Sequence, residues 1–401
     1  MSNTIRVLKG FRDFLPKEAR KRQWLRAQMI KVFERWGYEP METPTLESYD
    51  LFKGEVGEDE KLFYKFKDLG DRDVMLRYDQ TVPTCRVVGQ YSNEMKFPFR
   101  RYQIQSNFRA EKPQAGRFRE FVQADIDIFG VASPLADAET IAVSLDLYKS
   151  LGFKNVVAVI NSRDLMKGVP YEAIVAIDKL KKIGEDGVIA DMVSKGIDKD
   201  QALKYFDYVK NIQPDETLKT IFDYLRVSGF ADDWYKFDPM LARSFSYSQG
   251  PIWEIIIPEY PSGSVGGGER YDGMMKRITG RDIPATGIAF GFDRTLGAIE
   301  ICGLLPELDI STQVLVTIFS PETRNNSIGL SINLRRAGVR VELFPDDRTK
   351  LEKQLKYANA KNIPYVAILG PEEVASQTVK LKDMKTGEQK CLPVTELISI
   401  F

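Results

Sequence analysis

The feature that most constrains the fold is a pair of segments, residues 100–111 and 121–129, in which apolar and polar side chains alternate on either side of a short turn. A repeat of two residues is typical of a strand with one buried face, whereas a helix repeats at three and four residues. The two segments are close enough in the chain to pair directly. We therefore predict an antiparallel hairpin with one apolar and one polar face.

The polar face of this hairpin carries an unusual set of side chains between Phe121 and Phe129. A solvated sheet face is the ordinary explanation for such a row. Solvated faces are, however, usually built from lysine, glutamate and threonine, and aspartate is a poor strand former. We interpret this face as the floor of a pocket for a polar, cationic ligand. Its polar residues are Arg109, Glu111, Gln123, Asp125 and Asp127.

The turn between the two segments contains Lys112, Gln114, Arg117 and Arg119, all of which can donate hydrogen bonds. Guanidinium groups match the geometry of phosphate oxygens. We therefore expect the turn to overhang the pocket and to contact phosphate.

A second candidate segment is ATGIAFGFDRTLGAIEICG, residues 285–303. Its first part reads as a buried strand, and Asp293 is a plausible N-cap for a helix whose Leu296 and Ile299 face the core. Arg294 then lies in the first turn, where a positive charge is mildly unfavourable. Arg294 is either a solvated residue or a second contact for an anion, and we favour the anion contact.

Composition excludes several kinds of site. The 401 residues include no histidine, which rules out a histidine base and a histidine metal ligand. Cys85, Cys302 and Cys391 are far apart in sequence, so we expect buried thiols without a disulfide framework or a metal site. Basic and acidic residues balance at 57 each, so contact with nucleic acid requires a local patch.

The sequence contains no apolar run long enough to span a membrane. The opening residues, MSNTIRVLKGFRDFLPKEARKR, lack the apolar core of a signal peptide. We therefore expect a cytoplasmic protein, and its length suggests two or three domains.

Several short motifs carry a family resemblance. FRAE followed by a loop and RFREF (residues 108–121) resembles motif 2 of class II aminoacyl-tRNA synthetases, and GIAFGFDR (287–294) resembles motif 3. GYEPMETPTLE (37–47) resembles motif 1, the dimer-forming segment. Together with KGFRDFLP, LRYDQTVP, FDPMLAR and VGGGERYDG, these motifs make nearly the whole chain resemble the histidyl-tRNA synthetase family.

The resemblance implies an α+β fold. Its antiparallel-sheet catalytic domain would comprise residues 1–161, with motifs 1 and 2, and residues 239–308, with motif 3. Residues 162–238 would form a helical insertion, in agreement with their apolar spacing of three and four residues. Residues 309–401, which alternate strand-like and helical patterns before a terminal hairpin, would form a small α/β anticodon-binding domain.

The resemblance also implies a reaction. ATP and histidine would give histidyl-adenylate, and histidine would then pass to the 3′ end of tRNA(His). The implied cofactors are ATP and its accompanying Mg²⁺, and the implied partners are histidine, tRNA(His) and a second copy of the chain bound through the motif 1 region. An attacking carboxylate needs no protein base, so a protein without histidine can run this chemistry.

Carried over residue by residue, the resemblance assigns an ATP-binding set and a histidine-binding set. It places Arg109 at the α-phosphate, Glu111 near the adenine, Arg117 at the outer phosphates, Phe121 against the base and Arg294 at the γ-phosphate or the other adenine face. The implied histidine-binding residues are Asp79, Thr81, Gln123, Asp127, Tyr271 and Arg243. Since Arg243 also reaches the α-phosphate, the implied catalytic residues are Arg109, Arg243 and Arg294.

Contacts with tRNA are implied in two places. Gln114 in the motif 2 loop resembles the residue that reads the extra guanosine of this tRNA. In the last domain, Arg335, Arg336 and Lys356 belong to a basic stretch, which alone would more often be a solvated face.

Three positions depart from the family pattern. Ser244 and Ser248 of LARSFSYSQG replace a glycine and a tyrosine, and Glu269 stands where glycine is common. These departures concern the amino-acid pocket more than ATP binding, so two alternatives stay open. One is a silent paralogue resembling the regulatory subunit of ATP phosphoribosyltransferase, a family that lacks the last domain and tends to lose the motif arginines. The other is a synthetase-like enzyme for another amino acid or a protein substrate.

Overall fold

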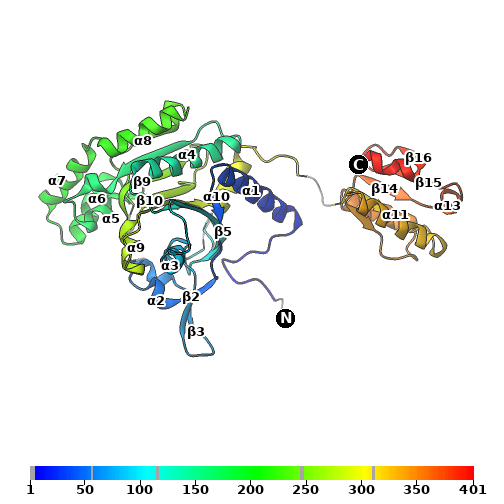
Figure 1. Cartoon of the computed structure of the whole chain (residues 1–401), viewed down its shortest axis with the longest axis horizontal. Coiled ribbons are helices and arrows are strands. Elements are labelled where there is room, and N and C mark those ends of the chain that lie inside the picture. The colour runs from blue at the N-terminus through cyan, green and yellow to red at the C-terminus, as the bar shows by residue number, and fades with distance from the viewer. Residues whose placement is uncertain (1–4, 56, 114–116, 244–247, 309–311) are drawn as a thin grey trace. The chain divides into compact units, whose positions relative to one another are not determined.

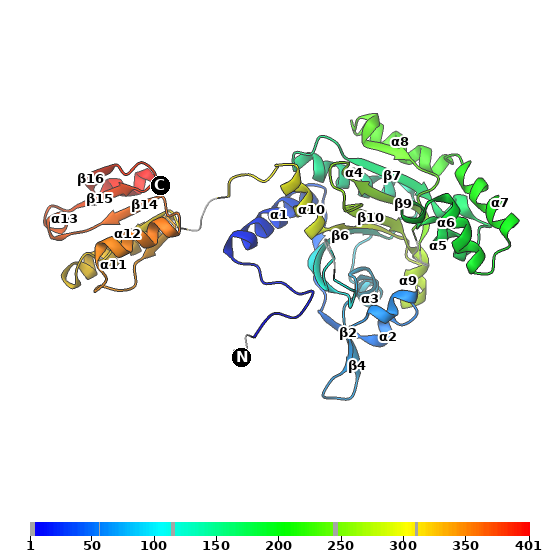
Figure 2. The same ribbon diagram turned by 180° about the vertical axis from the view of Figure 1, so that it is seen from behind.

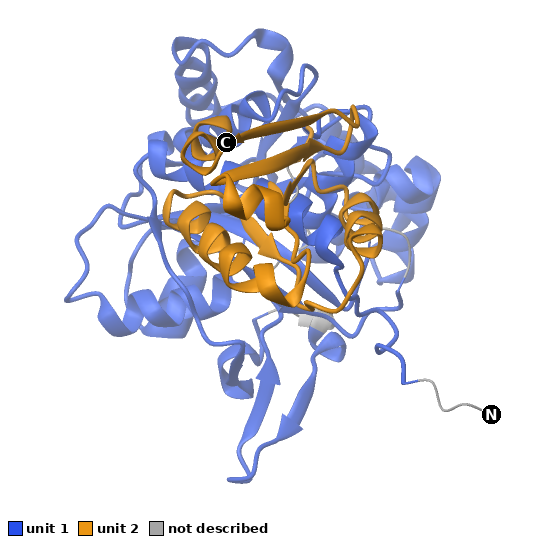
Figure 3. Cartoon of the chain, turned by 90° about the vertical axis from the view of Figure 1, so that its right-hand side faces the viewer, with its two compact units in different colours: residues 1–306 blue, residues 307–401 orange. Residues whose placement is uncertain are grey.

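The computed structural model of the chain describes residues 5–55, 57–113, 117–243, 248–308 and 312–401. The chain forms two compact units, a first unit of residues 1–306 and a second unit of residues 307–401 (Figure 3). No helix in the described residues is long and apolar enough to cross a membrane.

An eight-stranded sheet forms the centre of the first unit (Figure 1). Its neighbours pair antiparallel except for two parallel pairs, β1 with β5 and β7 with β8. The mixture of this sheet with helices confirms the predicted α+β class. In spatial order the strands are β1 (Glu39–Pro40), β5 (Phe99–Phe108), β6 (Glu120–Phe129), β11 (Ala285–Gly291), β10 (Gly266–Arg270), β9 (Gln249–Ile256), β7 (Val157–Ser162) and β8 (Tyr235–Phe237).

The predicted hairpin is confirmed as β5 and β6, which pair from Phe99 with Phe129 to Phe108 with Glu120. The strand prediction was too long at one end, because β5 stops at Phe108 and not at Glu111. Beyond Phe108 the ladder is held by a further hydrogen bond, from the amide of Arg109 to the carbonyl of Arg119 at 2.9 Å. The chain then leaves the sheet, and this departure directs Glu111 and the turn over the polar face.

Helices cover the apolar face of the sheet, where the alternating hairpin residues from Val122 to Ile128 join the main core. Figures 1 and 2 show α1 and α4 over this side of the sheet, with α8 lying against α4. A buried pair, Phe33 and Phe290, stacks at a centroid distance of 5.7 Å where α1 meets the sheet. The covering helices are α1 (Pro16–Arg35), α4 (Pro134–Ser150), α8 (Glu216–Val227) and α10 (Phe292–Ile301).

A second core lies at the polar side of the sheet and joins Phe129 and Tyr271 to two helices that pack on each other. These helices are α3 (Thr81–Tyr91) and α9 (Asp272–Thr279). A small sheet and a short helix, α2 (Tyr49–Phe52), lie beside them. The small sheet is ordered β2 (Leu46–Ser48), β4 (Asp73–Leu76) and β3 (Lys65–Lys67).

The junction of β11 and α10 corrects one prediction. The N-cap of α10 is Gly291, without a side-chain cap, and Asp293 lies in the first turn of the helix. Its carboxylate is already engaged elsewhere, since it accepts hydrogen bonds from Arg12 at 2.8 Å, Arg22 at 2.5 Å and the amide of Val122 at 3.1 Å. Leu296 and Ile299 are buried in the main core, as predicted.

Between β7 and β8 the chain forms a helical segment with its own apolar core. Asp198 caps α7 by accepting hydrogen bonds from two amides of its first turn, and Asp215 caps α8 by accepting one, from the amide of Leu218. The first three helices of the segment are α5 (Tyr171–Ile177), α6 (Leu180–Ser194) and α7 (Lys199–Lys210).

The second unit contains a five-stranded mixed sheet and four α-helices among its described residues. The predicted terminal hairpin is confirmed as β15 and β16. The strands run in the order β13 (Val341–Leu343), β12 (Val314–Val316), β14 (Tyr365–Ile368), β15 (Thr378–Asp383) and β16 (Gln389–Pro393). The helices are α11 (Arg324–Arg336), α12 (Leu351–Ala360), α13 (Pro371–Ala375) and α14 (Val394–Leu397).

The three cysteines are free thiols. The prediction that they are buried holds for Cys85 but is wrong for Cys391, which is exposed because it lies on the edge strand β16. Cys302 is half-buried after the end of α10.

Candidate active site

The polar face of the sheet places one row of side chains across four strands. Arg101 on β5 lies opposite Asp127 on β6, Asp127 lies opposite Gly287 on β11, and Gly287 lies opposite Glu269 on β10. The next row runs from Gln103 through Asp125 and Ala289 to Gly267. Small residues on β11 thus leave space above the sheet, with charged side chains on both sides of it.

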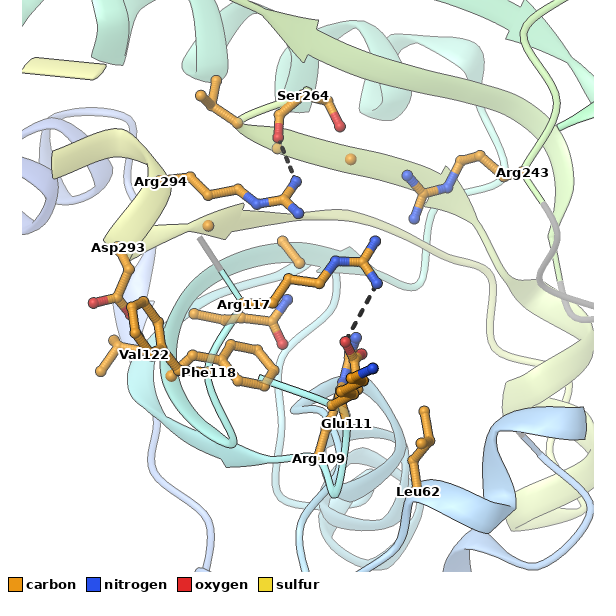
Figure 4. Close-up of a pocket in the computed structure, with 18 residues that line it drawn as sticks. Leu62, Arg109, Glu111, Arg117, Phe118, Val122, Arg243, Ser264, Asp293 and Arg294 are labelled. Atoms are coloured by element: carbon orange, nitrogen blue, oxygen red, sulfur yellow. Dashed lines mark hydrogen bonds and ion pairs between the residues drawn. The ribbon is translucent and has the colours of Figure 1, made fainter. Parts of the chain in front are cut away.

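A cavity of about 580 Å³ lies over one end of this face (Figure 4). Every residue predicted to bind ATP lines it, and so does Arg243. Lys112 and Phe118 of the turn also line it, which confirms that the turn overhangs the pocket; Gln114 lies outside the described residues. The predicted residues in the lining are Arg109, Glu111, Arg117, Phe121, Arg243 and Arg294.

Guanidinium groups converge on this larger cavity. Figure 4 shows Arg117, Arg243 and Arg294 pointing into the same space. Arg117 pairs with Glu111 at 3.3 Å, and Arg294 donates to the carbonyl of Ser264 at 2.8 Å. Arg294 is half-buried, and this burial lowers the pKa of its guanidinium. The larger cavity therefore suits an anion with several negative oxygens.

A smaller cavity of about 60 Å³ adjoins the larger one. The two cavities share part of their lining, including Arg109, Gln123 and Arg243. All the residues predicted to bind histidine line the smaller cavity. They are Asp79, Thr81, Gln123, Asp127, Tyr271 and Arg243.

Asp127 is fixed in the smaller cavity by three neighbours. Tyr271 donates a hydrogen bond to its Oδ1 at 2.5 Å, and Nη2 of the fully buried Arg101 lies 2.5 Å from its Oδ2. The third neighbour is Gly287, because a Cβ at that position would collide with the carboxylate. Burial raises the pKa of Asp127, and the charge of Arg101 opposes this rise. Asp127 is therefore a preorganised hydrogen-bond acceptor.

Two other residues of the smaller cavity are also held in place. Asp79 accepts a hydrogen bond at 3.1 Å from the amide of Val82, at the start of α3, and burial raises its pKa. Gln123 accepts a hydrogen bond from Asn107 at 2.6 Å. This hydrogen bond uses the side-chain oxygen of Gln123 and so orients its amide group, whose nitrogen takes no part in the contact with Asn107.

Two of the three departures from the family pattern meet at this cavity. Ser248 donates a hydrogen bond to Glu269, and Glu269 lies 3.4 Å from Arg243 in an ion pair. Ser248 and Glu269 are both buried, and Glu269 lines the smaller cavity. Ser244 lies outside the described residues. The departures are therefore coupled, because the serine and the glutamate contact each other.

The amino-terminal segment is tied to the larger cavity. The carbonyl of Gly10 accepts a hydrogen bond from the amide of Arg119 at 2.9 Å, and the Arg12 guanidinium lies 3.3 Å from the centre of the Phe118 ring. Arg12 also pairs with Asp293 at 2.8 Å. The segment thus connects the turn after β5 with the first turn of α10.

The predicted tRNA contacts of the last domain line neither cavity. Arg335 and Arg336 are exposed at the end of α11, where Arg335 donates to the carbonyl of Val341 at 3.2 Å. Lys356 is exposed on α12 and pairs with Glu352 at 2.7 Å. All three side chains belong to the second unit.

The predicted ATP- and histidine-binding sets omitted Arg101, Asp125 and Glu269, although Asp125 was predicted on the pocket floor and Glu269 was noted as a departure from the family pattern. Arg101 and Asp125 occupy polar positions of the alternating hairpin, on the same face as Arg109 and Asp127. Burial of Asp125 is nearly complete, and its pKa lies well above the usual value because of that burial. The sequence marked Glu269 only as a departure from the family pattern, because its place beside Gly287 depends on the pairing of β10 with β11.

The arrangement has a clear chemical meaning. A cavity with four carboxylates can hold a small cationic group, and a cavity lined by arginines can hold a phosphate chain. Arg243 borders both, where it can stabilise charge that develops as a group held in one cavity reacts with a phosphate held in the other.

Comparisons with known proteins agree with this geometry. The family model for histidyl-tRNA synthetase matches residues 10–185 and 190–295, and that for an anticodon binding domain matches residues 313–401. A curated relative, the histidine–tRNA ligase of Gloeobacter violaceus, is 34% identical, with 96% of each chain covered.

Solved structures give the same picture. The crystal structure of histidyl-tRNA synthetase from Nostoc sp. PCC 7120 is similar with a TM-score of 0.82 at 27% identity, and covers 99% of this chain and 98% of that one. A Bacillus halodurans structure titled ATP phosphoribosyltransferase regulatory subunit/histidyl-tRNA synthetase shares the fold, with a TM-score of 0.72 at 22% identity over 89% of this chain and 97% of that one. The chain belongs to the histidyl-tRNA synthetase family.

Proposed function

We propose that this protein activates histidine with ATP to form histidyl-adenylate and transfers histidine to the 3′ end of tRNA(His). The observation that carries this proposal is the pair of adjoining cavities, one with carboxylates and one with arginines, which share Arg109 and Arg243. Family membership and the name of the Gloeobacter relative support the same reaction.

The smaller cavity would hold the amino acid. Asp127 and Tyr271 would face the imidazole, and Asp79, Thr81 and Gln123 would orient the α-amino group and the carboxylate. This places the substrate carboxylate beside Arg243, at the boundary with the larger cavity. The carboxylate is already ionised, so its attack on the α-phosphate requires positioning and no protein base.

The larger cavity would hold ATP with its accompanying Mg²⁺. Arg109 and Arg243 would contact the α-phosphate, where negative charge develops in the transition state. Arg117 would bind the outer phosphates after release from Glu111, which could then contact the adenine, and Phe121 would stack on the base. Arg294, presented from the first turn of α10, would hold the γ-phosphate or the other face of the adenine.

We also propose the predicted domain division, with catalytic residues 1–161 and 239–308, a helical insertion at 162–238 and an anticodon-binding domain at 309–401. Its support is that β7 and β8 flank a helical segment with a separate core. The tRNA would contact Arg335, Arg336 and Lys356 and the motif 2 loop with Gln114. A homodimer through the motif 1 region and a cytoplasmic location complete the proposal.

The silent-paralogue alternative is less well supported. Arg109, Arg117 and Arg294 are all present and line one cavity, and residues 313–401 match the anticodon binding domain. An enzyme for another amino acid has one observation in its favour, the contact of Ser248 with Glu269, the latter of which lines the smaller cavity.

The deciding experiment is ATP–pyrophosphate exchange with each proteinogenic amino acid supplied in turn. We expect exchange with histidine alone, since the smaller cavity offers acceptors to a small cationic side chain. Exchange with another amino acid would support altered specificity, and the absence of exchange with every amino acid would overturn the ligase proposal.

A further inference from the structure

The carboxylates of the smaller cavity outnumber its guanidinium groups. Four line it, Asp79, Asp125, Asp127 and Glu269, against Arg109 and Arg243. A third guanidinium, that of Arg101, pairs with Asp127 from the neighbouring strand. Buried carboxylates are normally paired with cations or hydrogen-bond donors, so this surplus favours a cationic ligand.

Asp125 is the least satisfied of these groups. Its side chain is 2% exposed, and its Oδ1 has no hydrogen-bond partner among the described residues. Because an unmet buried acceptor is costly, a carboxylate that served the fold alone would be expected to have a donor. Asp125 lies two residues before Asp127 on β6 and lines the same cavity. The free oxygen is therefore available to a ligand.

Glu269 forms the opposite wall. It lies on β10, separated from Asp125 and Asp127 by β11, whose Gly287 and Ala289 form the floor. Two strand spacings amount to about 10 Å, which is room for a planar ring with a hydrogen bond on each side. Ser248 donates to one oxygen of Glu269, and Arg243 lies near the other. These two contacts hold the Glu269 carboxylate in place as an acceptor on the β10 side of the cavity.

We infer that Asp125 and Glu269 bind the amino-acid substrate from opposite walls of the smaller cavity and select one with a positive charge on its side chain as well as on its α-amino group. This inference rests on the proposed function and specifies the form of histidine that binds, the imidazolium form. Neither residue is part of the predicted histidine-binding set. A neutral ring of the same shape would leave one carboxylate without a donor and would bind less well.

The test compares histidine with 1,2,4-triazole-3-alanine, an analogue of the same shape whose ring is a much weaker base. ATP–pyrophosphate exchange is measured with the full chain at about pH 6, where much of the histidine carries the imidazolium charge. The variants are Asp125→Asn and Glu269→Gln, which remove the charge and keep the shape. A matched control is Glu254→Gln, since Glu254 lies on β9 opposite Gly267 but lines neither cavity.

We expect the wild type to favour histidine by roughly tenfold in kcat/KM, and each variant to lose roughly fivefold of that preference. The control should keep the wild-type ratio, and the KM for ATP should stay constant throughout. An unchanged ratio in both variants, or no preference in the wild type, would overturn the inference while leaving the ligase proposal intact. Absence of exchange with any amino acid would instead overturn the ligase proposal.

Discussion

At the scale of single residues, the smaller cavity holds buried carboxylates whose charged forms are disfavoured in the folded protein. Burial raises the pKa of Asp79, Asp125 and Asp127, which means that the folded protein binds a proton at each of them more tightly than the unfolded chain does. A raised folded-state pKa gives stability that is present below the unfolded pKa, near 4, and is lost as the pH rises through the folded value. The ligand-free protein should therefore become less stable as the pH rises from about 4 through the folded-state pKa values of these carboxyl groups.

This sign gives a stability prediction for Asp125→Asn. Removing a buried charge with an unmet oxygen should raise the thermal midpoint of the ligand-free protein at about pH 7.5, while histidine stabilises the variant less than it stabilises the wild type. Differential scanning calorimetry with and without histidine measures both effects. A lower midpoint for the ligand-free variant would show that Asp125 serves the fold.

A second residue-scale prediction concerns Asp127→Asn. Since Asp127 accepts a hydrogen bond from Tyr271 and lines the cavity proposed to hold histidine, the variant should raise the KM for histidine by roughly tenfold or more, about 1.4 kcal/mol, and leave the KM for ATP unchanged. Steady-state pyrophosphate exchange with each substrate varied in turn measures this. Unchanged histidine kinetics would remove Asp127 from the site.

At the scale of elements, the polar and apolar faces of the β5–β6 hairpin could be predicted because a repeat of two residues fixes which side chains share a face. The same reasoning could not include Glu269, because its place beside Gly287 depends on the pairing of β10 with β11, which no local pattern encodes. The N-cap at Asp293 failed for a related reason. Its carboxylate is taken by Arg12 and Arg22, both more than 250 residues away in the chain.

The placement of Arg243 and Arg294 at the larger cavity gives a prediction at the scale of elements. Arg294→Ala and Arg243→Ala should each lower kcat for activation by orders of magnitude, because both residues line the larger cavity and in the proposed reaction would face charge that develops on the phosphates. Arg226→Ala on α8, whose exposed side chain pairs with Asp223, is the control and should retain full activity. Single-turnover adenylate formation measures the effect. A site variant that keeps half of the wild-type rate would mean that the wrong arginine was assigned.

At the scale of the whole molecule, the two units have separate cores and separate chemistry. Both cavities described above belong to residues 1–306, and the exposed basic residues of α11 and α12 belong to residues 307–401. A chain that ends at Leu308 should therefore keep histidine-dependent pyrophosphate exchange and lose most tRNA charging. Equal loss of both activities would show that the second unit is needed for the adenylation site.

A milder form of the same test neutralises Arg335, Arg336 and Lys356 together. Because phosphate contacts release counterions, the tRNA affinity of the wild type should fall steeply with added salt, and the triple variant should show a shallower dependence. Filter binding over a salt series measures both slopes, and equal slopes would place the tRNA contacts elsewhere.

The contacts of the amino-terminal segment should control how fast a protease cleaves it. Gly10 and Arg12 hold the segment against Arg119, Phe118 and Asp293. It contacts two elements that line the larger cavity, so binding of ATP to either element should slow the local opening that exposes the backbone of the segment to cleavage. Trypsin, which cuts after Lys9 and Arg12, should therefore remove this segment more slowly when ATP is bound, and Asp293→Asn should accelerate cleavage in both states. The segment can thus serve as a built-in reporter of nucleotide occupancy.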